Sequence, residues 1–129
     1  MRIELADVAL IDRTLRRKRR RRRGTTGVDL RGLLADILVW ANRFVPSQAG
    51  SILLDDPASK MGGEAQGTLY FVACFGRRAK KLVGTSIPDD SGIVGETYRI
   101  GRPYFCEDVR RDDRFLALPD KRALRECRS

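Results

Sequence analysis

The spacing of apolar residues in the first part of the chain predicts helices. In residues 3–15 they recur every three or four positions, which is the helical period. These positions are Leu5, Val8, Ile11 and Leu15. The pattern therefore predicts a first helix that runs into the arginine-rich residues that follow, with Leu5, Val8 and Leu15 as candidates for a seam between two copies of the chain.

A second helix is predicted after the break GTTG at 24–27. Asp29 is placed to cap its first turn, and Pro46 ends it. Its apolar positions are Leu30, Leu33, Leu34, Ile37, Leu38, Trp40, Ala41 and Phe44. They cover a broad face, so we expect Trp40 and Phe44 to lie in the core, although both are also suited to a dimer seam.

From Ala49 the period changes to that of strands. The segment AGSILLDDP at 49–57 reads as a strand closed by a turn, and TLYFVACFG at 68–76 reads as a second strand rich in β-branched and aromatic residues. A Gly-rich loop at 61–67 joins them. Neighbouring strands with such a connection predict an antiparallel pair.

The second half of the chain alternates short elements. RRAKKLVG at 77–84 is a connector or short helical turn, and the residues before Pro88 form a short extended piece. GIVGETYRIG predicts a helix that Gly101 ends, and PYFCEDV at 103–109 predicts a further strand. Together these elements predict an α+β fold, an antiparallel sheet with helices packed on it.

Composition restricts the chemistry. A chain of 129 residues has room for one core, and it contains no histidine, which removes the commonest general base and metal ligand. Its cysteines, Cys74, Cys106 and Cys127, are widely spaced and form no CxxC pair, which favours free thiols over disulfides or zinc. We expect no metal and no cofactor, and neither a membrane span nor a secretory signal, so a cytoplasmic chain is the default.

The net charge of +9 is local. Eight consecutive cations form what we call the arginine tract: Arg16, Arg17, Lys18, Arg19, Arg20, Arg21, Arg22 and Arg23. Without the tract the charge is +9 − 8 = +1, so the high isoelectric point describes this tract and not a basic domain surface. The tract lacks interleaved aromatic residues, so any contact with nucleic acid phosphates or anionic lipid headgroups is independent of sequence.

From about Leu30 to Ser129 the ordered segments resemble the GAF domains of bacterial signalling proteins. AGSILLDDP is similar to the first strand of that family, and SIPDDSGIVGETYRIGRPYFCEDVRRDDRF is similar to its most recognisable stretch. The resemblance implies an N-terminal helix and polybasic linker at 1–29 and a GAF-like domain at 30–129. Family members continue with further strands past the position of Arg128 and Ser129. The resemblance therefore also implies that the last strands are missing. The first strand, Ser51–Leu54, would then have an unpaired edge, which predicts self-association or mobility there and at Phe105–Val109.

The resemblance implies a non-enzymatic sensory or regulatory domain that binds a small molecule, forms a homodimer, or does both. The residues that fall where the family builds its pocket are Gly92, Ile93, Val94, Gly95, Phe105, Asp108, Asp113 and Phe115. For the glycines, close helix packing is the competing structural role. For the aspartates, the competing role is turn capping.

Three alternatives remain open. A charge-driven binder of nucleic acid or anionic surfaces through residues 16–23 is the first. Cyclic-nucleotide binding has partial support, since only Phe115 and Asp120 match the residues that such members use. A thiol-dependent reductase similar to the free-methionine-sulfoxide reductases is disfavoured, because Val94 stands where they carry a cysteine and residues 77–90 contain none.

Overall fold

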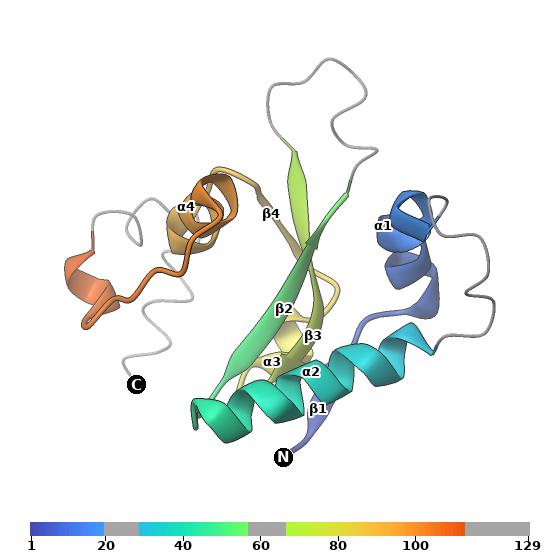
Figure 1. The fold of residues 1–129 in the computed structure, drawn as a ribbon, viewed down its shortest axis with the longest axis horizontal. Coiled ribbons are helices and arrows are strands. Elements are labelled where there is room, and N and C mark those ends of the chain that lie inside the picture. The colour runs from blue at the N-terminus through green and yellow to red at the C-terminus, as the bar shows by residue number, and fades with distance from the viewer. Residues whose placement is uncertain (20–28, 57–66, 113–129) are drawn as a thin grey trace. The chain divides into compact units, whose positions relative to one another are not determined.

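The computed structural model describes residues 1–19, 29–56 and 67–112. The chain divides into two compact units at Ile87/Pro88, and each is described by itself. The first unit holds the sheet and the helices that cover it. The second holds a helix and a short 3-10 turn (Figure 1).

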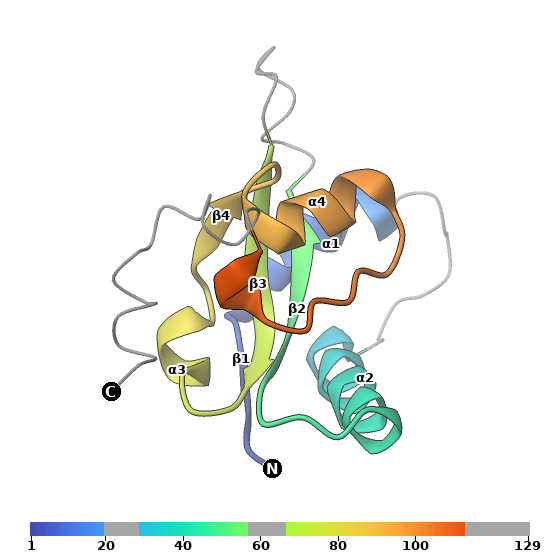
Figure 2. The same ribbon diagram turned by 90° about the vertical axis from the view of Figure 1, so that its left-hand side faces the viewer.

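An open antiparallel sheet forms the centre of the first unit. Its order is β1 (Ile3–Leu5), β3 (Thr68–Phe75) and β2 (Gly50–Asp55), and β4 (Ser86–Pro88) also pairs with β3. Figure 2 shows β3 running between β1 and β2. The strands predicted at 49–57 and 68–76, and their antiparallel pairing, are confirmed.

Two helices complete the core of this unit, α1 (Val8–Arg19) and α2 (Leu30–Phe44). They lie on the same side of the sheet in Figure 1. The core is built from apolar residues of both helices and of β3, together with Ala6 just after β1: Ala6, Ile11, Leu34, Leu38, Val72, Ala73 and Phe75. A short helix, α3 (Ala79–Leu82), follows β3, as the sequence allowed.

Polar contacts fix α1 in place. The Thr14 side chain is fully buried, and its hydroxyl lies 3.1 Å from the carbonyl oxygen of Leu10 and 3.0 Å from that of Ile11. The Arg13 guanidinium lies over the Tyr70 ring, 5.2 Å from its centroid, and its Nε is 3.7 Å from a carboxylate oxygen of buried Asp56. The Thr14 hydrogen bonds lie within α1, whereas the Arg13 contacts tie the helix to the ends of β2 and β3.

The predicted limits of α2 are confirmed. The Asp29 carboxylate accepts a hydrogen bond of 3.1 Å from the Gly32 backbone N–H, which caps the first turn. The helix ends at Phe44, two residues before Pro46, which has no N–H to continue it.

The helix predicted over residues 3–15 is wrong in its first part. Residues Ile3–Leu5 form β1, which pairs with Ala73–Phe75, and the Ala6 N–H donates to the Val72 carbonyl oxygen at 2.9 Å. Helix α1 begins only at Val8. Apolar residues spaced by three are compatible with either element, and the open edge of β3 supplies backbone hydrogen bonds that decide in favour of a strand.

The core position expected for Trp40 and Phe44 is also wrong. Their side chains are 56% and 81% exposed, whereas Leu34 and Leu38 on the same helix are buried against the sheet. At 100° per residue, Trp40 and Phe44 project about a third of a turn away from that buried pair. One rotation of α2 cannot bury both sets.

The three residues proposed for a seam in the first segment differ in burial. Leu5 and Leu15 pack against the core, while Val8 is 54% exposed. The exposed apolar residues that could form a seam therefore belong mainly to α2 instead of the first segment.

The second unit contains α4 (Gly92–Ile100), followed by an extended segment and the 3-10 turn η2 (Val109–Arg111). Gly101 ends α4 in the left-handed conformation, with φ 69°, as predicted. The strand predicted at 103–109 is absent: residues 103–108 belong to no strand, and Val109 begins η2. The aromatic residues favour a strand, but Asp108 caps a turn, and this local hydrogen bonding prevails.

Candidate functional site

The first turn of α4 holds four of the predicted ligand residues, Gly92–Gly95. Gly92 has φ 65°, a conformation that side chains with a Cβ rarely adopt. A Cβ on Gly95 would lie 2.6 Å from the carbonyl carbon of Asp90 and 2.9 Å from the carbonyl oxygen of Asp89. Both glycines are thus required by the way the chain enters the helix. The contact at Gly95 is with the backbone that precedes the helix.

Ile93 and Val94 lie between these glycines and are half-buried. Asp89, just before the helix, is buried, and Asp90 is exposed. The two aspartates place negative charge beside the N-terminus of α4, where it interacts favourably with the helix dipole. This charge also disfavours an anionic ligand at the same place.

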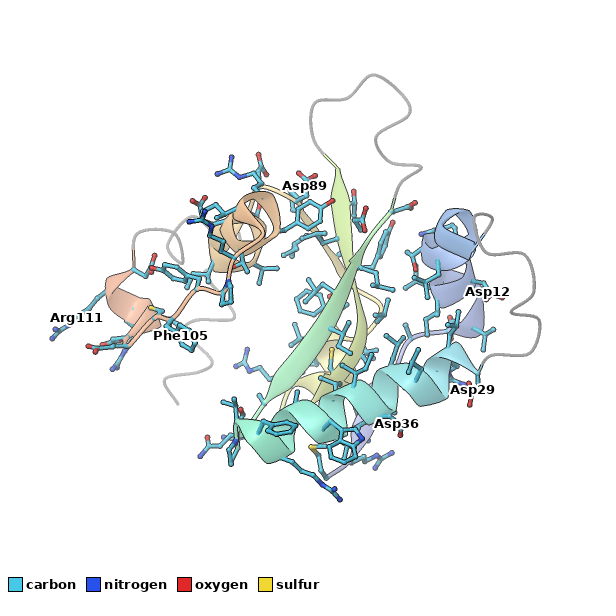
Figure 3. The ribbon with its side chains drawn as sticks, in the orientation of Figure 1. Asp12, Asp29, Asp36, Asp89, Phe105 and Arg111 are labelled. Carbon is cyan, nitrogen blue, oxygen red and sulfur yellow. The ribbon has the colours of Figure 1, made fainter. Side chains whose placement is uncertain are left out.

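Phe105 stands apart from these residues. Its side chain is 92% exposed, and Figure 3 shows Phe105 and Arg111 at the opposite end of the unit from Asp89. The described structure does not bring Phe105 and the first turn of α4 together into one pocket. Two further predicted residues, Asp113 and Phe115, lie outside the described residues, as does Asp120.

Asp108 is engaged in its own turn. Its carboxylate accepts the Arg110 backbone N–H at 3.0 Å and the Arg110 Nε–H at 3.1 Å, and the Arg111 Nε lies 3.8 Å away. The Arg110 side chain first, and its backbone N–H second, lower the pKa of the Asp108 carboxyl group. The turn-capping role that competed with ligand binding at Asp108 is confirmed.

A small polar cluster is formed by residues on either side of Phe105 in the sequence. The Tyr104 hydroxyl donates to the Asp112 carboxylate. Burial raises the pKa of the Cys106 thiol, and the hydrogen bond with Asp112 and the charge of that carboxylate raise it further. Burial also raises the pKa of Cys74, whose side chain is fully buried in β3. Both thiols therefore stay protonated at neutral pH, which is unfavourable for a nucleophile.

A shallow depression of about 340 Å³ lies elsewhere, in the first unit. It is lined by Met1, Arg2, Asn42, Ser47, Gln48, Phe75 and Gly76. None of the predicted ligand residues borders it. The Asn42 amide oxygen already accepts the Ser47 N–H at 2.8 Å, so part of its polar lining serves to hold the chain after α2.

Helix α2 carries an exposed apolar surface, of which the sequence offered only Trp40 and Phe44, as the alternative to a core position. We call it the α2 stripe: Leu33, Ile37, Trp40 and Phe44, with exposed fractions of 48%, 47%, 56% and 81%. Its signal is present in the sequence as a spacing of four, three and four residues. The same helix also carries Leu34 and Leu38, so the spacing alone does not show which set faces the sheet.

The arginine tract begins inside α1. The backbone of Arg16–Arg19 continues this helix, and residues 20–23 lie outside the described part of the chain. Within residues 1–19, 29–56 and 67–112, no three cysteine, aspartate or glutamate side chains are grouped to hold a metal ion. No helix in these ranges is long and apolar enough to cross a membrane.

No family model matches the sequence, and comparisons with curated proteins and with solved structures find no match either. The residues and their geometry are therefore the basis for the functional proposal below.

Proposed function

We propose that this chain is a GAF-like regulatory domain that acts without catalysis, by binding a small molecule near the start of α4 and by pairing with a second copy of itself. The observation that carries the proposal is the segment Asp89–Gly101. It contains the GIVG pattern, and it folds as a helix whose entry needs Gly92 and Gly95 and whose end needs Gly101.

Further support comes from the first unit. The segment similar to the first GAF strand forms β2 of an antiparallel sheet, and helices pack on that sheet as the resemblance implies. The raised pKa values of Cys74 and Cys106 support a role other than thiol chemistry. Ile93 and Val94 are the half-buried apolar residues that a small ligand at the start of α4 would contact.

Native mass spectrometry of freshly purified protein tests the ligand. We expect a mass above that of the denatured chain, and we expect Ile93→Ala or Val94→Ala to reduce the amount of retained molecule. Ile100→Ala is the matched control, because Ile100 is half exposed at the other end of the same helix. Two results together would contradict ligand binding. The first is a native mass equal to that of the denatured chain, and the second is a melting temperature of the protein that does not rise when the dialysable small-molecule fraction of a cell extract is added.

A second candidate function is electrostatic attachment to polyanions through the arginine tract. The observation in its favour is that the tract starts within α1, which Ile11 and Thr14 anchor in the core. A cation-rich helical segment held by the domain is a suitable contact for phosphate groups. The salt dependence of DNA binding, given in the Discussion, tests it.

A further inference from the structure

The α2 stripe is a continuous apolar surface on a helix that is already fixed to its own core. Leu34 and Leu38 face the sheet at 6% and 4% exposure, and the stripe lies about a third of a turn from them. Two large side chains of the stripe are pre-arranged: the Trp40 and Phe44 rings stack with centroids 6.5 Å apart, and the Arg43 guanidinium lies 5.0 Å from the Trp40 centroid. Large contiguous apolar surfaces of this kind mark interaction sites.

The spacing of the stripe specifies the shape of its occupant. Steps of four, three and four residues are those of the seam between two paired helices, in which the side chains of one helix fit between those of the other. A second copy of α2 presents the same spacing. We therefore propose that two copies of this chain associate through their α2 stripes, with the helices antiparallel. This inference adds a surface and an orientation to the pairing in the proposed function.

Charges beside the stripe select the antiparallel orientation. Asp36 and Arg43 flank it, and Figure 3 shows Asp36 on the side of α2 away from the sheet. With a twofold axis between Ile37 and Trp40, Asp36 of one copy and Arg43 of the other lie on the same flank, about 3 Å apart along the helix axis. Symmetry gives this opposite-charge contact twice. In a parallel pair, Asp36 would face Ala41 of the other copy, and no such contact would form.

Side-chain size supports the same orientation. In the antiparallel pair, Phe44 of one copy meets Leu33 of the other, and Trp40 meets Ile37, so that each large ring is matched with a smaller side chain. In a parallel pair Trp40 would meet Trp40 and Phe44 would meet Phe44. Alternating large and small side chains fill a seam more evenly than large residues set against large ones.

The first experiment measures association of the full chain by sedimentation over a dilution series, with Trp40 fluorescence as a second readout. Trp40 is the only tryptophan, so its emission reports on the stripe directly. We expect a monomer–dimer equilibrium and an emission that shifts to shorter wavelength as the dimer forms. A strict monomer overturns the inference, as does a blue-shifted emission that does not depend on concentration, since that would show the stripe covered within one chain.

Matched variants test the surface. Ile37→Gln is expected to weaken dimerisation roughly tenfold or more, while Ile100→Gln leaves it unchanged. The two isoleucines have similar exposure, 47% and 52%, but Ile100 lies on α4. Circular dichroism checks that each variant is folded. A folded Ile37→Gln variant that dimerises like the wild type overturns the proposal that the α2 stripe is the dimer surface. Ligand retained in native mass spectra would in that case still support the ligand-binding part of the proposed function.

A charge exchange tests the orientation. Asp36→Arg and Arg43→Asp each place like charges together in the antiparallel pair and should each weaken association about tenfold. The double variant restores opposite charges and should recover most of the loss. Single variants without effect, or a double variant that is weaker than both, would overturn the antiparallel arrangement.

Discussion

At the scale of single residues, Gly95 is a position where packing against backbone leaves no room for a side chain. We expect Gly95→Ala to destabilise the chain by about 1–3 kcal/mol, because its Cβ would press on the backbone of Asp89 and Asp90. Gly101→Ala is the matched control: it costs about 1–2 kcal/mol through its positive φ, but nothing lies within 4 Å of the added Cβ.

A second substitution at each glycine separates the two causes of destabilisation, steric contact at Gly95 and positive φ at Gly101. Gly95→Leu should lower the melting temperature further than Gly95→Ala, whereas Gly101→Asn should be milder than Gly101→Ala, because asparagine tolerates the left-handed conformation. Thermal denaturation followed by circular dichroism measures all four. An unchanged melting temperature in Gly95→Leu would contradict the placement of α4 against the Asp89–Asp90 backbone.

The Asp108 turn predicts a dependence on acid. The pKa of Asp108 is lower in the folded chain than its usual value of 3.8, so its contribution to the turn is complete above that value and is lost as the pH falls through the folded pKa. Carboxyl-carbon NMR titration should show this depressed pKa, and Arg110→Gln should raise it. Arg99→Gln is the control, since Arg99 pairs with Glu96 instead. A pKa for Asp108 at or above its usual value would contradict the geometry of the turn.

At the scale of elements, the arginine tract should account for all affinity for DNA. For duplex DNA we expect the logarithm of affinity to fall against that of salt concentration with a slope of about −0.9 per phosphate neutralised. Replacing residues 16–23 with glutamine should abolish binding, since the remaining net charge is only +9 − 8 = +1. Exchanging Lys80 and Lys81 for glutamine is the control and should change little. Sequence-specific binding by the variant without the tract would contradict this interpretation.

The elements that the sequence predicted well are those whose signal is local. For α2, the apolar period, the Asp29 cap and Pro46 agree, and for β3 an uninterrupted run of β-branched and aromatic residues is sufficient. For Ile3–Leu5 the decisive interaction is with Ala73–Phe75, far along the chain, and the local pattern does not contain it. For residues 103–109, two local signals compete, because the aromatic residues favour a strand whereas Asp108 favours a turn, and propensity alone does not show which prevails.

The candidate site was predicted less well than the fold. The glycines of α4 were identified because a glycine signals a restricted backbone wherever it lies. The sequence alone does not define the α2 stripe, because the exposed residues depend on how the helix is rotated against the sheet. Leu34 and Leu38 decide that rotation through contacts with other elements. A pattern of apolar positions shows that faces exist but not which face is buried.

At the scale of the whole molecule, β3 organises the sheet, because it is paired along both edges and its residues Val72, Ala73 and Cys74 are fully buried. Within the described residues, β2 is paired only with β3. We therefore expect amide hydrogen exchange to be slowest in Val72–Cys74 and faster in Ser51–Leu54. Mass spectrometry of peptic fragments measures both, and Phe105–Val109, which belongs to no strand, should exchange fastest of the three. Slow exchange in Ser51–Leu54, equal to that of β3 in a monomer, would contradict this order.

The pairing of β1 with β3 has a consequence for the order in which the chain folds during its synthesis. Ile3 lies opposite Phe75, a separation of 75 − 3 = 72 residues. At about 5–20 residues per second, the first strand waits roughly 4–14 s before its partner has been made. Until then its backbone donors and acceptors are satisfied by water or by other chains. The N-terminal strand therefore cannot pair until β3 has been made, and a nascent chain held by a chaperone would present Ile3–Leu5 throughout this interval.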